Sequence, residues 1–213
     1  MKIRSLEELV DHLGENSKIR KRELISISSD LARSKAMANE RTLRSAVVFA
    51  YAHWEGFVKD ASQAYIRYAT YKTRPIGSYI PAFQALASRS KLFVAQGASR
   101  RVAPHLAVVN QLVDNLKQAC NIDVDAAIDT ESNLSSDVFE NICLSIGFQY
   151  AETWSAYGPL MNDMYASRCA IAHGQLFVPS DEQAGECLRF SINSIGLFST
   201  EVLNSASQEL FLR

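Results

Sequence analysis

The spacing of the apolar residues constrains this chain more than any other feature, because most of them recur at intervals of three and four residues. That period places them on one face of an α-helix, and few stretches alternate as a β-strand would. Glycine and proline, which interrupt helices, number only 9 and 5 in 213 residues. The sequence therefore predicts an all-α fold, a bundle of amphipathic helices.

Turn-forming residues divide this pattern into separate helices. Gly14 is expected to end a short first helix, and Pro75, Gly77 and Pro81 interrupt the chain after a long apolar one. The helices expected from spacing and turns cover residues 6–13, 17–38, 42–71, 82–94, 104–120, 138–146, 159–172 and 180–206.

Several residues are suited to the ends of these helices. Ser135 or Ser136 is an N-cap candidate, and Pro159 suits the first position of the next helix. Gly174 fits the left-handed position that follows a helix end, and Ser180 opens the last helix. These signals place the stretch before Gly174 at the closing turn of a helix.

Length and composition indicate one packed domain spanning residues 1–213. Hydrophobic residues make up 47% and charged residues 21%, which suits a folded core. Within this domain, residues 1–40 are read as accessory helices and 82–133 as a helical insertion. No run approaches the roughly 20 apolar residues of a membrane span, and the charged start lacks a signal-peptide core. We therefore expect a cytoplasmic location without membrane association.

The four cysteines are expected to be reduced. None pairs as CxxC or lies beside a histidine at metal-ligand spacing, so we expect no metal site. We also expect no cofactor. Two of them are candidate core residues, namely Cys143 and Cys187.

Charge is unevenly distributed although the net charge is only −1. Residues 1–101 hold 18 basic and 9 acidic side chains, a balance of +9, whereas residues 102–213 hold 4 and 14, a balance of −10. This asymmetry fits either a basic surface for a partner or two oppositely charged segments packed together.

The candidate site is the pair Arg168 and His173, directly followed by Gly174. Arginine offers a permanent planar cation to phosphate oxygens, and histidine exchanges a proton near neutral pH. Five residues apart, the two side chains point about 140° from each other on an ideal helix. Cooperation therefore requires the helix to end near His173, or a second copy across a two-fold interface.

This pair suits cleavage of RNA, which carries its own nucleophile in the 2′-OH. His173 could act as the base or the acid, while Arg168 holds the phosphate and stabilises the transition state. The competing interpretation is structural: Arg168 pairs with Glu55 or Asp163, and His173 only caps the helix.

Glu55 is the second notable residue because it interrupts an apolar run between Trp54 and Gly56. A buried carboxylate needs a partner, and Arg168 would be suitable. The alternative is an exposed pair with Lys59 at i,i+4.

Other candidates on this helix are weaker. His53 lies close to Glu55 in sequence, although a core or interface role suits it equally. Farther along, aromatic and basic residues interleave, which fits either a stacking surface for single-stranded nucleic acid or an ordinary helix edge. These residues are Tyr65, Arg67, Tyr68, Tyr71, Lys72 and Arg74.

Motifs for several other activities are absent. The sequence contains no Walker loop, no GxGxxG after a strand, no HExxH and no GxSxG. Nucleotide hydrolysis, dinucleotide chemistry, zinc proteolysis and serine hydrolysis therefore have no support.

Two motifs together resemble a known family. The run RCAIAHG from Arg168 to Gly174 resembles the R-N-x-I-A-H-G signature of HEPN domains (higher eukaryotes and prokaryotes nucleotide-binding). The run YAHWEGFVK from Tyr51 to Lys59 resembles the WEGFVK helix of a bacterial HEPN branch described from toxin–antitoxin loci. The similarity covers roughly residues 40–205 and departs at Cys169, where the signature usually has asparagine.

The resemblance implies an all-α HEPN-like bundle with additional helices that dimerises through the helix carrying the motif. It implies a metal-independent endoribonuclease in a toxin–antitoxin or phage-defence system, inhibited or activated by a cognate partner protein. Arg168 and His173 would be catalytic. Glu55 would be a supporting residue that positions Arg168. Apart from the resemblance, Cys169 and His53 are further supporting candidates, and Lys59 and Arg67 are weaker substrate-binding candidates.

A second interpretation belongs to a different functional class. A thiol is a poor hydrogen-bonding group, so Cys169 could leave a non-catalytic HEPN module that binds RNA, nucleotide or a partner protein. A purely structural helical dimer is the third possibility.

Overall fold

The computed structural model of this chain describes residues 2–33, 40–97, 100–130 and 133–213. Within these ranges the regular structure is helical, and strand-like pairing is limited to two isolated bridges. The all-α prediction is therefore confirmed. The α-helices are α1 (Leu6–Arg33), α2 (Glu40–Tyr71), α3 (Pro81–Gly97), α4 (Val102–Asp114), α5 (Val124–Ala127), α6 (Ser136–Ile146), α7 (Tyr150–Thr153), α8 (Gly158–Ala172) and α9 (Asp181–Ser207), and the 3₁₀ turns are η2 (Ile76–Ser78), η3 (Asn115–Lys117) and η4 (Ser155–Tyr157).

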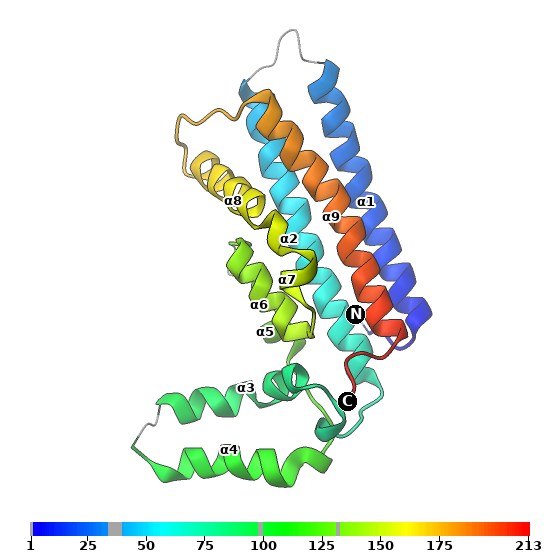
Figure 1. Ribbon diagram of the computed structural model, residues 1–213, viewed down its shortest axis with the longest axis vertical. Coiled ribbons are helices and arrows are strands. Elements are labelled where there is room, and N and C mark those ends of the chain that lie inside the picture. The colour runs from blue at the N-terminus through cyan, green and yellow to red at the C-terminus, as the bar shows by residue number, and fades with distance from the viewer. Residues whose placement is uncertain (1, 34–39, 98–99, 131–132) are drawn as a thin grey trace.

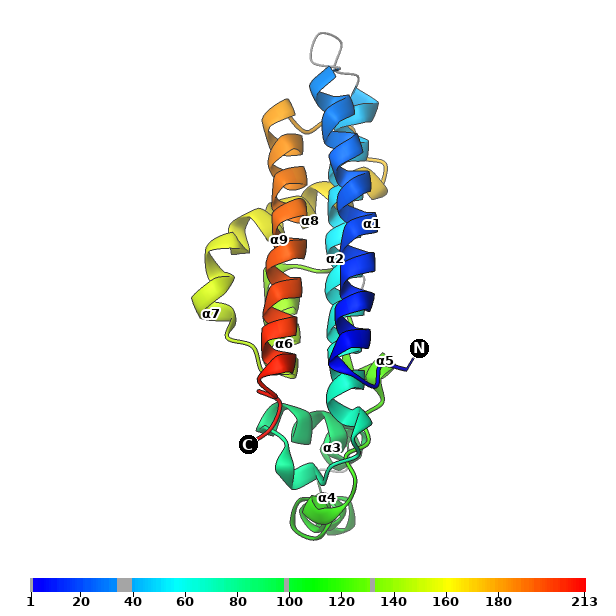
Figure 2. The ribbon, with the colours of Figure 1, turned by 90° about the vertical axis from the view of Figure 1, so that its right-hand side faces the viewer.

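Three long helices form the body of the molecule. In Figure 1, α1, α2 and α9 run side by side, with α6 and α8 on the other side of α2. Figure 2, turned by 90°, shows the same column with α3 and α4 at its lower end. Helix α2 is central because it packs on α1 and α9 on one side and on α8 and α6 on the other.

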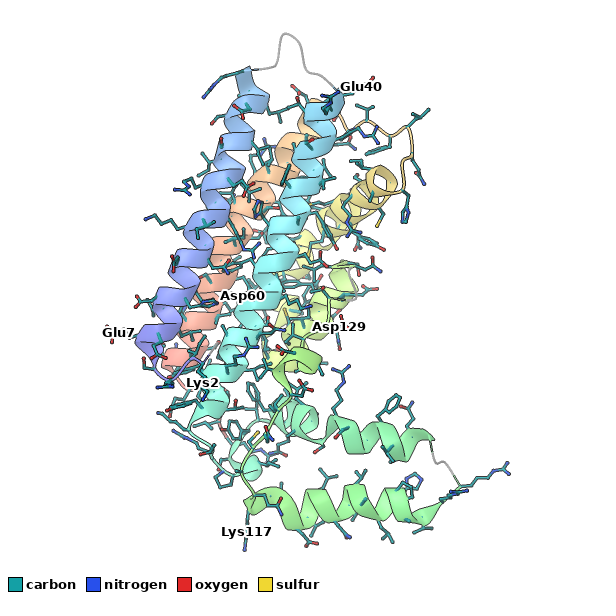
Figure 3. All side chains as sticks on the ribbon, turned by 180° about the vertical axis from the view of Figure 1, so that it is seen from behind. Lys2, Glu7, Glu40, Asp60, Lys117 and Asp129 are labelled. Carbon is teal, nitrogen blue, oxygen red and sulfur yellow. The ribbon has the colours of Figure 1, made fainter. Side chains whose placement is uncertain are left out.

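The predicted helix end at Gly14 is wrong, since α1 continues unbroken from Leu6 to Arg33. A glycine within a helix costs only about 1 kcal/mol relative to alanine, and the packing of α1 exceeds that. Its buried face is apolar on both sides of Gly14, and polar residues near Gly14 also bind α2. His12 Nε2 lies 2.6 Å from Asp60 Oδ2, and Asn16 Nδ2 donates to the same oxygen at 2.9 Å (Asp60 is labelled in Figure 3). The first two expected helices are therefore one.

Arg20 explains the glycine in the WEGFVK run. Its guanidinium crosses α2 so closely that a Cβ at position 56 would lie 2.8 Å from Nη1. The same nitrogen donates to the carbonyl of His53 at 3.3 Å. Gly56 therefore serves the contact between α1 and α2.

The core between α2, α6, α7 and α9 is aromatic. Trp54 and Trp154 are fully buried, with ring centroids 5.7 Å apart. Trp154 also donates from Nε1 to the carboxylate of Glu201 at 2.8 Å. Cys143 and Cys187 are buried and free, as expected of core thiols.

Helix ends are confirmed at most of the expected residues. Ser135 caps α6 by accepting the amide hydrogen bond of Val138, and Pro159 lies in the first turn of α8. Ser180 forms a capping box with Gln183 at the start of α9. The expected helix over 104–120 ends earlier, since α4 stops at Asp114 and η3 follows.

Helices α3 and α4 form an arm that projects from the end of the column (Figure 1). The arm begins at Pro81, one residue before the expected insertion over residues 82–133, and otherwise falls inside it. The other expected accessory region is residues 1–40. Within it, Leu6–Arg33 form α1, which packs along α2 and α9. In the ranges that the structure describes, no helix is both long and apolar enough to cross a lipid bilayer.

Candidate functional site

Arg168 lies on α8 where that helix packs against α2. Its guanidinium carbon is 4.9 Å from the centroid of the Tyr51 ring, a cation–π contact. Nη1 also donates to the sulfur of Cys169 at 3.7 Å. Burial lowers the pKa of Arg168, but this hydrogen bond and the negative charge of Glu55 contribute to raising it, and the net pKa is raised. The side chain is therefore a firmly charged, half-buried cation.

Tyr51 forms the fixed platform under this cation. The residue is buried, and its hydroxyl oxygen accepts the backbone N–H of Leu134 at 2.6 Å. Burial and the negative charge of Glu55 raise the pKa of Tyr51, so the ring stays neutral. Because the Tyr51 ring is fixed, its contact with the guanidinium favours one orientation of Arg168 before any ligand arrives.

Glu55 follows Tyr51 by one helical turn and faces the same region. Its Oε1 is buried and has no hydrogen-bond partner among the described residues. In that part of the chain, no salt bridge joins it to Lys59 or to Arg168. Its charge nevertheless acts on both Tyr51 and Arg168. Glu55 is therefore turned inward beside the cation, without a direct bond to it.

His173 lies where α8 ends. Gly174 adopts φ +72°, its N–H donates to the carbonyl of Ile171 at 3.1 Å, and the N–H of Gln175 donates to Ala170 at 3.0 Å. These two bonds define a Schellman C-cap. His173 itself is exposed, and its backbone N–H donates to Cys169 at 3.0 Å. The helix thus ends at the motif, and the imidazole remains open to solvent.

A groove opens beside this helix end. It has a volume of about 510 Å³, and Arg44 Nη2 closes one side by donating to the carbonyl of Gln175 at 3.1 Å. The lining combines two arginines with the exposed aromatic ring of Phe49. The lining residues are Glu40, Arg41, Arg44, Ser45, Val48, Phe49 and Ile171.

Sequence reasoning missed four residues of this region. They are Tyr51, Arg41, Arg44 and Phe49. Tyr51 could have been found because it precedes Glu55 by four residues, the spacing of one helix face. Arg44 precedes Tyr51 by seven residues and shares that face, whereas Phe49 points about 160° away from Tyr51 on an ideal helix. Only the fold shows that Ile171, in the last turn of α8, lines the same groove as Arg41, Arg44 and Phe49.

His53 is not brought together with Arg168. It faces α1, where Nε2 lies 3.2 Å from Glu23 Oε2, and its ring stacks on Phe49 with centroids 6.4 Å apart. Burial lowers the pKa of His53, and the attraction of Glu23 only partly opposes this. Its place is the interface between α1 and α2.

The stacking surface expected toward the end of α2 is contradicted. Tyr65 and Tyr68 are buried, because they pack on Phe211 with centroids 6.0 and 5.9 Å away. Arg67 is paired with Asp125 at 2.7 Å, and Lys59 is exposed without a pair among the described residues.

Basic residues at the end of α2 and just after it meet acidic residues from the second half of the chain. Lys72 and Arg74 both pair with Glu209, at 3.2 and 3.0 Å. Together with the pair between Arg67 and Asp125, these contacts join the basic and acidic halves. The packing of oppositely charged segments therefore accounts for part of the charge asymmetry.

A model of the family described as RiboL-PSP-HEPN matches residues 15–203. The chain belongs to this HEPN family. The match extends from α1 into α9 and includes the helices that carry Tyr51, Glu55, Arg168 and His173. Membership of the HEPN family suggests a nuclease or RNA-related role. No curated protein and no solved structure matches the chain.

Proposed function

We propose that this HEPN protein is an endoribonuclease that acts as a homodimer. The observation that carries the proposal is the arrangement at the end of α8: a pre-oriented cation, Arg168, followed by a helix end that leaves His173 exposed. On an ideal helix these side chains diverge by about 140°, so one copy alone does not aim them at one phosphate. A two-fold axis beside α8 supplies the second set of side chains.

The reaction uses the 2′-OH of RNA as the nucleophile. One imidazole accepts the 2′-OH proton while the 2′-oxygen forms a bond to phosphorus and the bond to the 5′-oxygen breaks. The His173 side chain of the second copy returns a proton to the leaving 5′-oxygen. Arg168 stabilises the charge that develops on the phosphate oxygens. The products are a 2′,3′-cyclic phosphate and a 5′-OH end.

The groove next to α8 is assigned to the nucleotide that adjoins the scissile phosphate. Arg44 and Arg41 supply positive charge at its wall, and Phe49 offers an exposed ring on which a base can stack. Lys59 remains a predicted contact for more distant phosphates. Arg67 is a weaker candidate, since Asp125 already binds its guanidinium.

The biological setting belongs to the same proposal. An unregulated ribonuclease damages its own host, so a toxin–antitoxin or phage-defence role with a controlling partner protein fits this activity. Growth arrest on expression of the wild-type chain, absent for His173→Ala, would support that setting. Equal growth with both chains would contradict it.

Incubation of the pure protein with RNA in EDTA tests the enzymatic proposal. We expect fragments with 2′,3′-cyclic phosphate ends, and loss of cleavage by at least 100-fold in Arg168→Ala and His173→Ala. Arg189→Ala and His105→Ala change the same residue types at exposed positions on α9 and α4, and both should cleave normally. Cleavage that survives in either motif variant would overturn the assignment.

Cys169 favours the non-catalytic module as the second candidate. Its thiol already engages Arg168 at 3.7 Å, where the family signature usually has asparagine. RNA that is bound but left intact, with binding weakened in Arg168→Ala, would select this alternative. Neither binding nor cleavage would leave a structural helical dimer.

A further inference from the structure

Helix α4 is covered on one side only. It belongs to the projecting arm, where it packs chiefly on α3 and on the adjacent turn η3. Figure 3 shows Lys117 where the chain leaves this helix and returns toward the column. A helix that carries apolar residues around most of its circumference requires a partner on its uncovered side.

The uncovered side of α4 carries a regular apolar stripe. The spacing along the stripe alternates between four and three residues, which is the 3.5-residue repeat of a coiled-coil seam. Each of these residues is between 52% and 68% exposed. The stripe, which we call the α4 seam, consists of Val102, Leu106, Val109 and Val113.

The seam lies opposite the face that touches the rest of the arm. On a helix with 100° per residue, the four seam residues fall within about 40° of one direction. Pro104 and Val108, which are partly covered, point about 200° and 240° away from that direction. Packing against α3 therefore uses one face of α4 and leaves the α4 seam free.

The charge pattern on α4 favours a second copy of the same helix. No Lys, Arg, Asp or Glu occurs between Val102 and Val113. Two identical charged faces would repel each other, but this face carries no such penalty. It also offers no cation to a nucleic acid and no charge to an oppositely charged protein. A specific interface buries at least about 1,000 Å² in total, so the contact has to include the exposed seam side chains of both copies and the residues beside them.

We propose that the α4 seam is an interface between two copies of this chain, in which α4 helices pair around a two-fold axis. This contact is separate from the pairing through α8 under the proposed function, since α4 lies on the arm and α8 on the column (Figure 1). With both contacts present, the protein forms assemblies of four or more chains. With the arm contact alone, it forms a dimer.

The mass of the protein in solution tests the proposal. Val109→Lys combined with Val113→Lys places charges on exposed positions of the seam, so the monomer fold is retained. We expect the mass measured by light scattering to fall at least twofold, whichever other interface exists. Ala107→Lys is the matched control, because it adds the same charge to an exposed position about 140° from the seam and should leave the mass unchanged.

Cross-linking provides the second measurement. Val109→Cys should form a disulfide between copies under mild oxidation, whereas Ala107→Cys and the wild-type protein should not do so at comparable rates. A mass that is the same in the wild type and the double lysine variant would overturn self-association and leave a helix of another protein as the occupant. Because the readouts are mass and cross-linking, they are independent of whether the protein cleaves RNA.

Discussion

The guanidinium of Arg168 lies 4.9 Å from the centroid of the Tyr51 ring, so an aromatic face on α2 holds the cation of α8. Within the described part of the chain, no carboxylate forms a salt bridge with it. This arrangement leaves the hydrogen-bonding edge of the guanidinium available, apart from its contact with Cys169. A cation held through its face can still bind a phosphate through its edge.

Two substitutions of Tyr51 distinguish the role of its hydroxyl group from the role of its ring. Tyr51→Phe should lower the free energy of unfolding by about 1–2 kcal/mol, because the buried N–H of Leu134 loses its acceptor. Cleavage should be retained, since the ring remains. Tyr51→Leu should reduce cleavage about tenfold by removing the cation–π contact. Equal cleavage rates in the two variants would show that the ring does not position Arg168.

Glu55→Gln should separate stability from activity. The carboxylate has a buried oxygen without a hydrogen-bond partner among the described residues, so removing its charge should leave stability unchanged or raise it by about 1 kcal/mol. Cleavage should fall, because the negative charge near Arg168 is lost. Denaturant unfolding and RNA cleavage check the two effects. The control Glu152→Gln, at an exposed position, should alter neither stability nor cleavage. If Glu55→Gln lowered stability and cleavage together, Glu55 would have a structural role.

Replacing Gly174 or Gly14 by alanine should change the free energy of unfolding in opposite directions. A Cβ at either position meets no heavy atom within 4 Å, so backbone conformation alone decides the outcome. Gly174→Ala should destabilise the protein by about 1 kcal/mol because its φ of +72° is left-handed. Gly14→Ala, inside α1, should stabilise it by about 0.5–1 kcal/mol. Urea unfolding of both variants checks the prediction. A change in the free energy of unfolding in the same direction for both would contradict it.

His53 should make stability depend on pH. Burial lowers its pKa in the folded protein, so the unfolded chain binds the proton more readily. Stability is therefore highest when the imidazole is neutral and decreases as the pH falls below about 6.5, the ordinary value. Replacing the imidazole by an amide, His53→Gln, should flatten the stability curve between pH 7.5 and 5. An unchanged slope in this variant would assign the dependence to other groups.

The groove predicts effects on substrate affinity. Arg44→Ala and Phe49→Ala should each raise KM several-fold, since they remove a cation and a stacking surface that line it. The value of kcat should change little, because neither residue belongs to the Arg168–His173 pair. Arg22→Ala, exposed on α1, is the matched control for Arg44. A fall in kcat at constant KM would instead place these residues in the chemical step.

Features with a local physical cause were predictable. Ser135, Pro159, Gly174 and Ser180 mark helix ends through hydrogen bonds or backbone angles within a few residues, and each lies where expected. The failure at Gly14 has the opposite origin. A weak local preference for ending the helix was overridden by burial against α2 and α9, which no local pattern reveals.

The sequence by itself determined the all-α class, most helix limits and the position of the Arg168–His173 motif at a helix end. Each follows from periodicity or capping, which act over short distances along the chain. Only the tertiary structure decided that Tyr51 supports Arg168, that His53 turns toward α1 and that Tyr65 and Tyr68 are buried. These outcomes depend on which faces of α2 meet α1, α8 and α9, and helix-to-helix packing is set by the whole core.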